Sequence, residues 1–581
     1  MDFDAILEDV GQFGRYQKMV IYLILLPAVI PCGFHAYAQL FMAAHVEHWC
    51  KVPELDIISD VSLVKNLSIP MELKNGQLQY SECTMYKLNY SDIAKNYQGI
   101  EGGLNSLKGS TAEVIPCTNG WTYEKSVYKS TVVTEWNLVC SGDFYPTLGL
   151  VLLAVGGIIG NYIFGYLQDT LGRKPSFFIY LLIECIFGVA TAFSQNYVIW
   201  CIYRFGVGFT VPAIMTTPYV LAIELVGPKS RTLCTILSNI AYSTGLILLA
   251  GVVYLVRDWR HLALATTLPF VCFFLYLWPM PESPRWLLAR GEFEKAEVIL
   301  RNMARSTDKL KQDIERTKMR KYGILDLFRT PNLRKKTIII TFIWFTNTSV
   351  YVGLSYYAPV LGGDEFLNFF LAGIVELPTY LFLWPSMERL GRRWTLCMSM
   401  VVGGVACLTT FLVQHENVRY CPITQNYYCI SETYVTLALY CVGKMGISSS
   451  FVVLPLMASE LYPTVVRGLG MSLSSVLGML GPIFIPLVNY LGSDIMVLPL
   501  IIMGALLVAG GIASLLLPET LNQHLPQTLE DGEKMGLDTD FCCNPPVKET
   551  SPKHEGKETD LEHTIDFHFT ILSLCVELSK G

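Results

Sequence analysis

The chain has 581 residues, of which 52% are apolar and only 16% are charged, and its formal net charge is −6. A soluble globular domain carries about a quarter charged residues, so this composition argues against an ordinary soluble protein and favours lipid as the solvent. The basic residues lie between apolar runs rather than on one face of a domain, which argues against nucleic-acid binding.

Twelve apolar runs are long enough to cross about 30 Å of hydrocarbon. A backbone in lipid must satisfy its hydrogen bonds within its own segment, so each run is predicted to be a helix. The first eighteen residues are polar and acidic, which argues against a cleavable signal peptide and predicts that the first run is retained as an anchor. The predicted spans are approximately 19–42, 146–167, 176–194, 197–219, 233–255, 260–280, 336–358, 366–386, 394–413, 432–455, 469–490 and 496–517.

Two soluble insertions interrupt these spans: a loop of about a hundred residues follows the first span, and a charged segment over 281–335 separates two sets of six. The segment from Arg285 to Lys321 is rich in Lys and Arg, whereas the short loops near 359–365, 415–431 and 491–495 contain almost none. The positive-inside rule therefore predicts that both termini are cytoplasmic. The predicted organisation is a cytoplasmic N-terminus over 1–18, a six-helix half over 19–280 with an outer loop over 43–145, a cytoplasmic linker over 281–335, a second six-helix half over 336–517, and a cytoplasmic tail over 518–581.

The outer loop carries an even number of cysteines, Cys50, Cys83, Cys117 and Cys140, which in an oxidising compartment predicts two disulfides. It also carries two glycosylation sequons, at Asn66 and Asn89. These features agree with the side that the charge pattern assigns. Cys421 and Cys429 form a smaller outer pair, for which free cysteines are the alternative.

Three charged motifs occur once in each half, in the same order and always at cytoplasmic helix ends. Such a parallel duplication of six spans is typical of transporters built from two related halves. We interpret the motifs as a gate, in which carboxylates such as Asp169 and Glu224 pair with arginines across the two halves when the inside is closed. The alternative is a solvated turn stabilised by helix-terminus charge. The predicted gate residues are Asp169, Gly172, Arg173, Glu224, Arg231, Glu388, Arg392, Glu460 and Arg467.

From residue 1 to about 530 the chain resembles the organic cation, carnitine and zwitterion branch of the major facilitator superfamily (solute carrier family 22-like). The motifs that carry the resemblance are Gly11-Gln-Phe-Gly-Arg-Tyr-Gln17, Ser130-Thr-Val-Val-Thr-Glu-Trp-Asn-Leu-Val-Cys140, Pro281-Glu-Ser-Pro-Arg-Trp286 and Glu460-Leu-Tyr-Pro-Thr464. The resemblance implies the major facilitator fold and disulfides Cys50–Cys117 and Cys83–Cys140. Thr170 departs from the superfamily pattern, which has a basic residue there. Met479 departs as well, because relatives carry a charged residue at that position.

Ionisable side chains inside predicted spans are costly, so Glu184, Glu376 and Lys444 are functional candidates by default. Aromatic side chains on the seventh span can hold a cation over their faces. The resemblance implicates Trp344, Tyr351 and Glu376 in a pocket, with Tyr219 and Met479 as further candidates. Two alternatives stay open: the aromatics are packing residues, and Glu376 and Lys444 neutralise each other as a structural pair. No role is assigned to Glu184.

The leading hypothesis is a plasma-membrane secondary or facilitative transporter of small organic cations or zwitterions, such as carnitine-like compounds. An organic anion exchanger on the same fold is the first alternative, and a receptor or accessory protein with a transporter fold is the second. The sequence contains no G-x-x-x-x-G-K-[ST] loop, which argues against a primary pump. It also contains no metal-ligand spacing and no nucleophile-and-base set that would support an enzyme. No cofactor is expected, and a coupling ion is left open.

Overall fold

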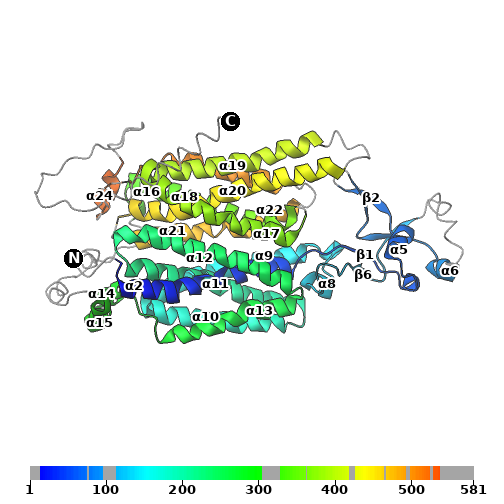
Figure 1. The fold of residues 1–581 in the computed structure, drawn as a ribbon, viewed down its shortest axis with the longest axis horizontal. Helices are drawn as coiled ribbons and strands as arrows, with labels where there is room; N and C mark the ends of the chain where they lie inside the picture. Colours follow the sequence, from blue (N-terminus) through cyan, green and yellow to red (C-terminus); the bar gives the residue numbers. More distant parts are fainter. Residues whose placement is uncertain are drawn as a thin grey trace, which may run out of the picture. The chain divides into compact units, whose positions relative to one another are not determined.

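The computed structural model describes residues 13–74, 77–95, 113–303, 327–361, 363–417, 426–463, 466–492, 498–521, 523, 526 and 528–536. Within this part, long helices run side by side through a bundle (Figure 1). Strands β1 (His48–Cys50) and β6 (Trp121–Tyr123) and helix α5 (Val61–Ser68) extend beyond one end of the bundle (Figure 1). Helices α14 (Pro284–Arg290), α15 (Phe293–Met303) and α24 (Leu529–Lys534) lie at the other end (Figure 1).

Eleven helical segments in the described part are long and apolar enough to cross a membrane, which confirms the prediction of a helical multi-pass protein. They begin and end near the charged motifs, so most are longer than the apolar runs alone indicate. The twelfth apolar helix, α23 (Leu498–Ser514), has 17 residues and follows a segment outside the described residues. The candidate spans are Arg15–Met42, Cys140–Leu171, Arg173–Ala192, Tyr197–Leu225, Ser230–Leu255, Trp259–Leu277, Pro331–Leu361, Glu365–Leu390, Arg392–Val413, Tyr434–Leu461 and Leu469–Leu491.

The bundle helices fall in this order along the chain. The first span is divided into α2 (Arg15–Val20), η1 (Ile21–Leu25), α3 (Leu26–Val29) and α4 (Cys32–Met42), with Pro27 and Pro31 at the interruptions. The first half continues through α9 (Phe144–Leu171), α10 (Arg173–Ala192), α11 (Tyr197–Leu225), α12 (Pro228–Leu255), α13 (Trp259–Val271) and η5 (Cys272–Leu277). The second half contains α16 (Pro331–Tyr357), α17 (Glu365–Ile374), α18 (Glu376–Leu390), α19 (Arg392–Asn417), α20 (Asn426–Leu461), α21 (Arg467–Gly478), α22 (Gly481–Leu491) and α23.

Two of the second-half spans are broken at prolines, and both breaks lie at candidate site residues. Pro378 lacks the N–H that would bond the Ile374 carbonyl, and the helix divides there into α17 and α18. Pro482 likewise frees the Gly478 carbonyl, which accepts a 2.5 Å hydrogen bond from the Thr348 hydroxyl. Glu376 therefore begins a helix instead of lying in the middle of one, and Met479 lies in the break between α21 and α22.

The outer loop is a small folded unit between α4 and α9. It contains three two-stranded antiparallel pairings and a buried apolar cluster that includes Trp49, Leu67 and Met85. Disulfides join Cys50 to Cys117 and Cys83 to Cys140, the pairing that the family resemblance implies. The elements are β1 (His48–Cys50), η2 (Pro53–Leu55), α5 (Val61–Ser68), β2 (Met71–Lys74), β3 (Gln77–Tyr80), β4 (Thr84–Tyr86), α6 (Tyr90–Lys95), β5 (Val114–Pro116), β6 (Trp121–Tyr123), α8 (Val132–Trp136) and η4 (Cys140–Gly142).

A half-buried ion pair and a hydrogen bond connect this loop to the bundle. Glu135 in α8 pairs with Arg260 at 2.5 Å and accepts a 2.7 Å hydrogen bond from the Trp259 indole, at the start of α13. The Thr131 hydroxyl caps α8, and Asn137 ends it in the left-handed conformation, with φ of 53°. The Ser130–Cys140 motif thus has a structural role at the outer end of the bundle.

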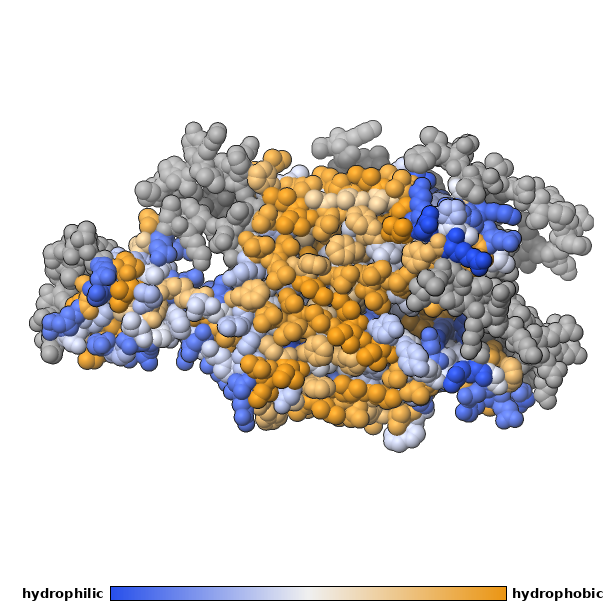
Figure 2. Space-filling view, turned by 180° about the vertical axis from the view of Figure 1, so that it is seen from behind, coloured by the Kyte–Doolittle hydropathy of each residue, from blue (hydrophilic) through white to orange (hydrophobic). Residues whose placement is uncertain are grey.

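The surface agrees with a lipid environment. Figure 2 shows a broad apolar region over the bundle helices, with hydrophilic residues gathered at the two ends. Large apolar side chains such as Leu182, Phe382 and Leu412 are exposed on these helices. An apolar surface of this extent is unfavourable in water and is satisfied by hydrocarbon.

Candidate substrate site and charge clusters

The centre of the candidate site is an ion pair between Glu376 and Lys444. The Lys444 Nζ lies 3.1 Å from Glu376 Oε1, and both side chains are at most 1% exposed. The atoms are close enough for an ion pair, although their orientation does not meet the angle of a hydrogen bond. Lys444 also donates a 2.6 Å hydrogen bond to the Ser355 hydroxyl and lies 3.6 Å from the centre of the Tyr351 ring.

Three hydroxyl groups surround the Glu376 carboxylate. Tyr380 donates a hydrogen bond at 3.1 Å, Tyr351 donates one at 3.3 Å, and Ser243 donates a third. Ser243 belongs to α12, in the first half of the chain, whereas the carboxylate belongs to α18 in the second half. The pair therefore lies where the two halves meet, which is the position of substrate sites in transporters of this construction.

An aromatic face adjoins the pair along α16. Trp344, Asn347 and Tyr351 are spaced by three and four residues, so they lie on one side of that helix. Trp344 and Tyr351 both contact the Phe451 ring, with centroid distances of 6.3 and 4.9 Å. The indole N–H of Trp344 and the amide nitrogen of Asn347 are buried without a hydrogen-bond partner among the described residues. Buried donors of this kind are costly unless a ligand or water accepts from them.

The other two predicted site residues lie at different distances from this centre. Met479 is next to Gly478, where an added Cβ would be 3.2 Å from Trp344, so its segment borders the aromatic face. The Tyr219 hydroxyl is 3.3 Å from that of Thr235 in α12, a contact within the first half. Ser243, Asn347, Ser355, Tyr380 and Phe451 complete the site. No feature of the sequence distinguishes these five residues, because hydroxyl and aromatic residues are common throughout the spans.

A second buried charge cluster lies within the first half. His35 Nδ1 is 3.0 Å from Glu184 Oε1, and the Thr210 hydroxyl donates to the same carboxylate. Arg204 donates at 2.8 Å to Gln39 Oε1 and at 3.0 Å to the His35 carbonyl. These groups are at most 2% exposed. Glu184 thus has buried polar partners on neighbouring helices. His35 and Arg204 are likewise ionisable residues inside predicted spans, so the criterion that singled out Glu184 would have found them as well.

The duplicated charged motifs form two matching clusters, one in each half. Arg173 makes two hydrogen bonds to Glu224, of 3.1 and 3.0 Å, and Arg392 approaches Glu460 to 3.3 Å. The start of α10 is capped by Glu282, which accepts from the Arg173 N–H at 2.9 Å, and the start of α19 by Glu519, which accepts from the Arg392 N–H at 2.8 Å. Burial raises the pKa of Glu282, and the hydrogen bonds from the Ser283, Arg173 and Lys174 N–H groups oppose that rise.

Glycines permit this capping geometry. Gly172 has φ of 103° and Gly391 has φ of 85°, a backbone region that other residues rarely adopt. A Cβ on Gly172 would lie 2.6 Å from Glu282 Oε2, and one on Gly391 would lie 2.5 Å from Glu519 Oε2. The spacing of Gly before Arg in both motifs therefore follows from the close approach of a carboxylate.

The remaining predicted gate residues make smaller contacts. Asp169 lies 3.5 Å from Arg173, Glu388 accepts a 2.6 Å hydrogen bond from Trp384, and Arg467 donates at 3.4 Å to the Tyr462 carbonyl. Arg231 takes part in an interaction as well. Cys421 and the Cys429 side chain, the predicted second disulfide, lie outside the described residues.

In this conformation Asp169 and Glu224 both contact Arg173 of their own half. Pairing with arginines across the halves stays a prediction for the state in which the inside is closed. Besides the contact of Ser243 with Glu376, the halves touch at the end of the bundle that carries the disulfide-bonded loop. Phe41 packs on Phe369 at 5.2 Å between ring centres, Phe144 on Tyr490 at 5.4 Å, and Tyr128 donates a 2.6 Å hydrogen bond to Glu365. At the opposite end of the bundle, Asp169, Glu224 and Glu460 each contact an arginine of their own half.

We expect Arg173→Ala to reduce transport per surface molecule much more than it reduces surface delivery. We expect the two hydrogen bonds from Arg173 to Glu224 to be made in one access state and broken in the other. Charge-assisted bonds of about 1.5–3 kcal/mol then correspond to an approximately ten-fold to hundred-fold change in the equilibrium between those states. Arg301→Ala is the control, since Arg301 is 51% exposed and pairs with Glu297 at 2.6 Å. Uptake normalised to surface biotinylation measures the effect. Equal normalised uptake in both variants would show that these charged clusters are solvated turns and not part of a gate.

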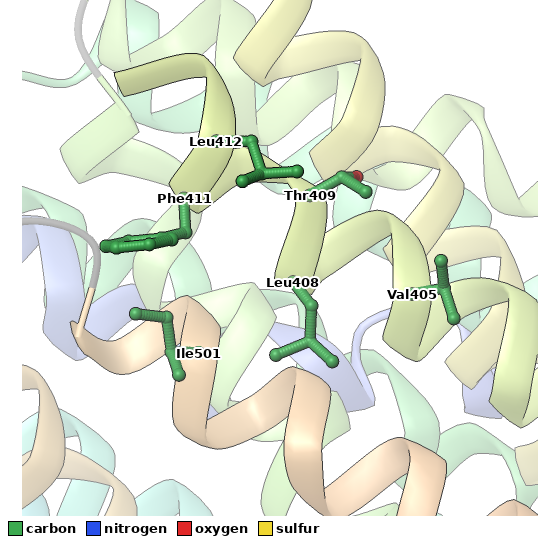
Figure 3. Close-up of a pocket in the computed structure, with 6 residues that line it drawn as sticks. All are labelled: Val405, Leu408, Thr409, Phe411, Leu412 and Ile501. Atoms are coloured by element: carbon green, nitrogen blue, oxygen red, sulfur yellow. The ribbon is translucent and has the colours of Figure 1, made fainter. Parts of the chain in front are cut away.

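The groove shown in Figure 3 is separate from this site. Val405, Leu408, Thr409, Phe411 and Leu412 of α19 and Ile501 of α23 line it, and none of these side chains is ionisable. Phe411 and Leu412 are 44% and 62% exposed on the apolar outer surface of the bundle. The groove is therefore a lipid-facing depression between two helices and not a place for a charged solute.

Comparisons with known proteins agree with the fold and the arrangement of the two halves. Residues 108–531 match the model of the family described as sugar (and other) transporter. The proton:xylose symporter XylE bound to 6-bromo-6-deoxy-D-glucose superposes with a TM-score of 0.56 at 17% identity, covering 88% of this chain and 99% of that one. A structure titled as the inward-open xylose transporter XylE from E. coli gives the same TM-score.

Relatives of known name are more similar in sequence. The beta-alanine transporter of Drosophila melanogaster is 56% identical over 94% of this chain and 91% of its own length. The carcinine transporter of the same organism is 43% identical over 93% and 81%. The human organic cation/carnitine transporter 2 is 34% identical over 91% and 93%. The chain belongs to the sugar (and other) transporter family of the major facilitator superfamily, among the organic cation and carnitine transporters, and it is a transporter of a small solute and not an enzyme.

Proposed function

We propose that this chain carries small zwitterions and amine cations across the plasma membrane by alternating access, and that β-alanine is among its substrates. The observation that carries the proposal is the buried Glu376–Lys444 pair, with Nζ and Oε1 3.1 Å apart where the halves meet. The beta-alanine transporter at 56% identity supports the choice of solute.

A zwitterion suits a pair of fixed opposite charges. Its ammonium group can take the place of the Lys444 Nζ at the Glu376 carboxylate, and its carboxylate can take the place of Glu376 at Lys444. Each buried charge then keeps a partner, so the site avoids an uncompensated charge while the solute is bound. The Trp344 and Asn347 donors that lack partners among the described residues offer further hydrogen bonds to a carboxylate, and the Tyr351 ring offers a face for an ammonium.

Uptake by cells that express the chain tests the proposal. We expect saturable uptake of labelled β-alanine above that of untransfected cells. Removing either charged end of the solute should cost one charge-assisted contact of about 1.5–3 kcal/mol. Propylamine and propionate should therefore compete about ten-fold to a hundred-fold more weakly than β-alanine.

The same assay distinguishes the alternatives. Labelled carcinine and carnitine test the wider amine range, and a labelled dicarboxylate tests the organic anion exchanger. If the cells take up the dicarboxylate but do not take up β-alanine, the chain is the anion exchanger instead. A chain that reaches the surface and moves none of these solutes would favour the receptor or accessory role.

The proposal includes the predicted topology: twelve spans in two parallel halves over 19–280 and 336–517, with both termini, the 281–335 linker and the 518–581 tail in the cytoplasm. Asn89 is exposed and Asn66 is half-buried on the loop that this topology places outside.

We expect a glycosidase added to intact cells to lower the apparent mass of the chain. The Asn66→Gln, Asn89→Gln double variant should show no such change. Glycan-free asparagines in all mature molecules at the cell surface would contradict the glycosylation, and protease access to the 281–335 segment from outside would contradict the orientation.

A further inference from the structure

The base of the outer loop contains a cluster of metal-ligand residues that transport does not use. Ligand atoms of His45, His48 and Glu82 all lie within 4.8 Å of one another. His45 and His48 follow α4 closely, whereas Glu82 comes from the segment between β3 and β4, so no local sequence motif joins the three.

A hydrogen bond holds the His48 imidazole in the tautomer whose Nε2 lone pair can bind a metal. Its Nδ1 is 2.9 Å from the Val46 carbonyl oxygen, which can only accept, so Nδ1 carries the proton in that hydrogen bond. In neutral imidazole this leaves the lone pair on Nε2. His48 is only 4% exposed, and Nε2 is buried without a hydrogen-bond partner among the described residues. Metal-binding histidines commonly donate their other ring N–H to a backbone carbonyl in this way.

The disulfides fix the surroundings of the cluster. Glu82 directly precedes Cys83, which is bonded to Cys140 at the entry to α9, and His48 lies in β1, which ends at the bonded Cys50. β1 pairs with β6, and His48 is opposite Tyr123. The main chain that carries two of the three ligands is therefore held on both sides, while exposed His45 is free to adjust.

We propose that His45, His48 and Glu82 form a binding site for a divalent transition metal, with Zn²⁺ as the ion best suited to it. Two imidazoles and a carboxylate are zinc ligands, and a fourth position is left for water. Zinc bonds of about 2.0–2.1 Å in a tetrahedron place ligand atoms roughly 3.4 Å apart. Each pair of ligand atoms thus needs to approach by about 1.4 Å at most, which rotation of the exposed His45 and half-buried Glu82 side chains can supply without moving the main chain. A bound ion would tie the outer end of α4 to the start of α9 through Glu82 and the Cys83–Cys140 bond.

The test uses the full chain purified in detergent, stripped with a chelator and titrated with Zn²⁺ against a chromogenic zinc indicator. We expect one high-affinity ion per chain and a rise in the thermal unfolding midpoint on its addition. His45→Ala and Glu82→Gln remove ligands that are exposed or half-buried, so both variants should fold. Each should weaken Zn²⁺ binding by more than about ten-fold and abolish the thermal shift, since loss of an outer-shell partner alone costs that much.

His261→Ala is the matched control. His261 is a histidine at the same end of the bundle, and its side chain is 77% exposed and pairs with Asp258. Its removal should leave Zn²⁺ binding unchanged. Absence of high-affinity binding to the parent chain, or binding that is unchanged in both His45→Ala and Glu82→Gln, would overturn the proposal.

Discussion

Glu376→Gln is expected to strand the Lys444 ammonium in the bundle and to lower the amount of the chain that reaches the cell surface. The Glu376 and Lys444 side chains are each at most 1% exposed, and the Glu376 carboxylate lies 3.1 Å from the Lys444 Nζ. Removing one partner of a buried ion pair typically costs about 3–5 kcal/mol, because the remaining charge has lost its compensation. Glu113→Gln is the control, since Glu113 pairs with Lys87 at 2.8 Å and its side chain is 68% exposed. Surface biotinylation of both variants measures the difference.

The double variant Glu376→Gln, Lys444→Gln separates scaffold from substrate site. It removes both charges, so we expect surface delivery to return toward that of the parent chain. If the pair binds the solute, β-alanine uptake per surface molecule stays low after this rescue. Recovery of uptake with unaltered affinity would instead assign the pair to the scaffold, which is the structural alternative that the sequence left open.

Arg204→Gln is expected to have an effect of similar size in the first half. Arg204 is 1% exposed, donates to Gln39 and to the His35 carbonyl, and attracts Glu184 electrostatically. Its loss leaves the Glu184 carboxylate buried without a cation of fixed charge, at a cost of about 3–5 kcal/mol. We expect a lower thermal unfolding midpoint in detergent and less chain at the surface.

Two further variants test the cause of that loss. Arg301→Gln should behave as the parent chain, because an exposed ion pair such as Arg301–Glu297 is worth about 0–1 kcal/mol. Glu184→Gln combined with Arg204→Gln should be less destabilised than Arg204→Gln alone, since no charge remains unpaired in the double variant. Equal destabilisation of the single and double variants would show that packing and hydrogen bonds, and not charge compensation, hold this cluster.

Local sequence determined the helices and the loop that interrupts them. A run of about twenty apolar residues has one solution in hydrocarbon, a helix with its own hydrogen bonds, so the spans follow from hydropathy alone. The ends of these helices follow from the backbone preferences of single residues. Gly172 and Gly391 supply a positive φ, and the adjacent arginines begin the next helices. Pro378 marks the break in the eighth span, because a missing N–H is a local property.

Charge partners were decided by the tertiary structure. Whether Glu376 meets Lys444 depends on the packing of α18 against α20, and the Ser243 hydroxyl arrives from α12 in the other half. Arg173 at the start of α10 meets Glu224 because α10 and α11 pack together within the first half. His45, His48 and Glu82 meet because disulfides draw separate segments of the loop together. Hydropathy and local backbone preference act over a few residues and can be read along the chain, whereas a buried charge is matched by whichever opposite group the packing brings within a few ångströms.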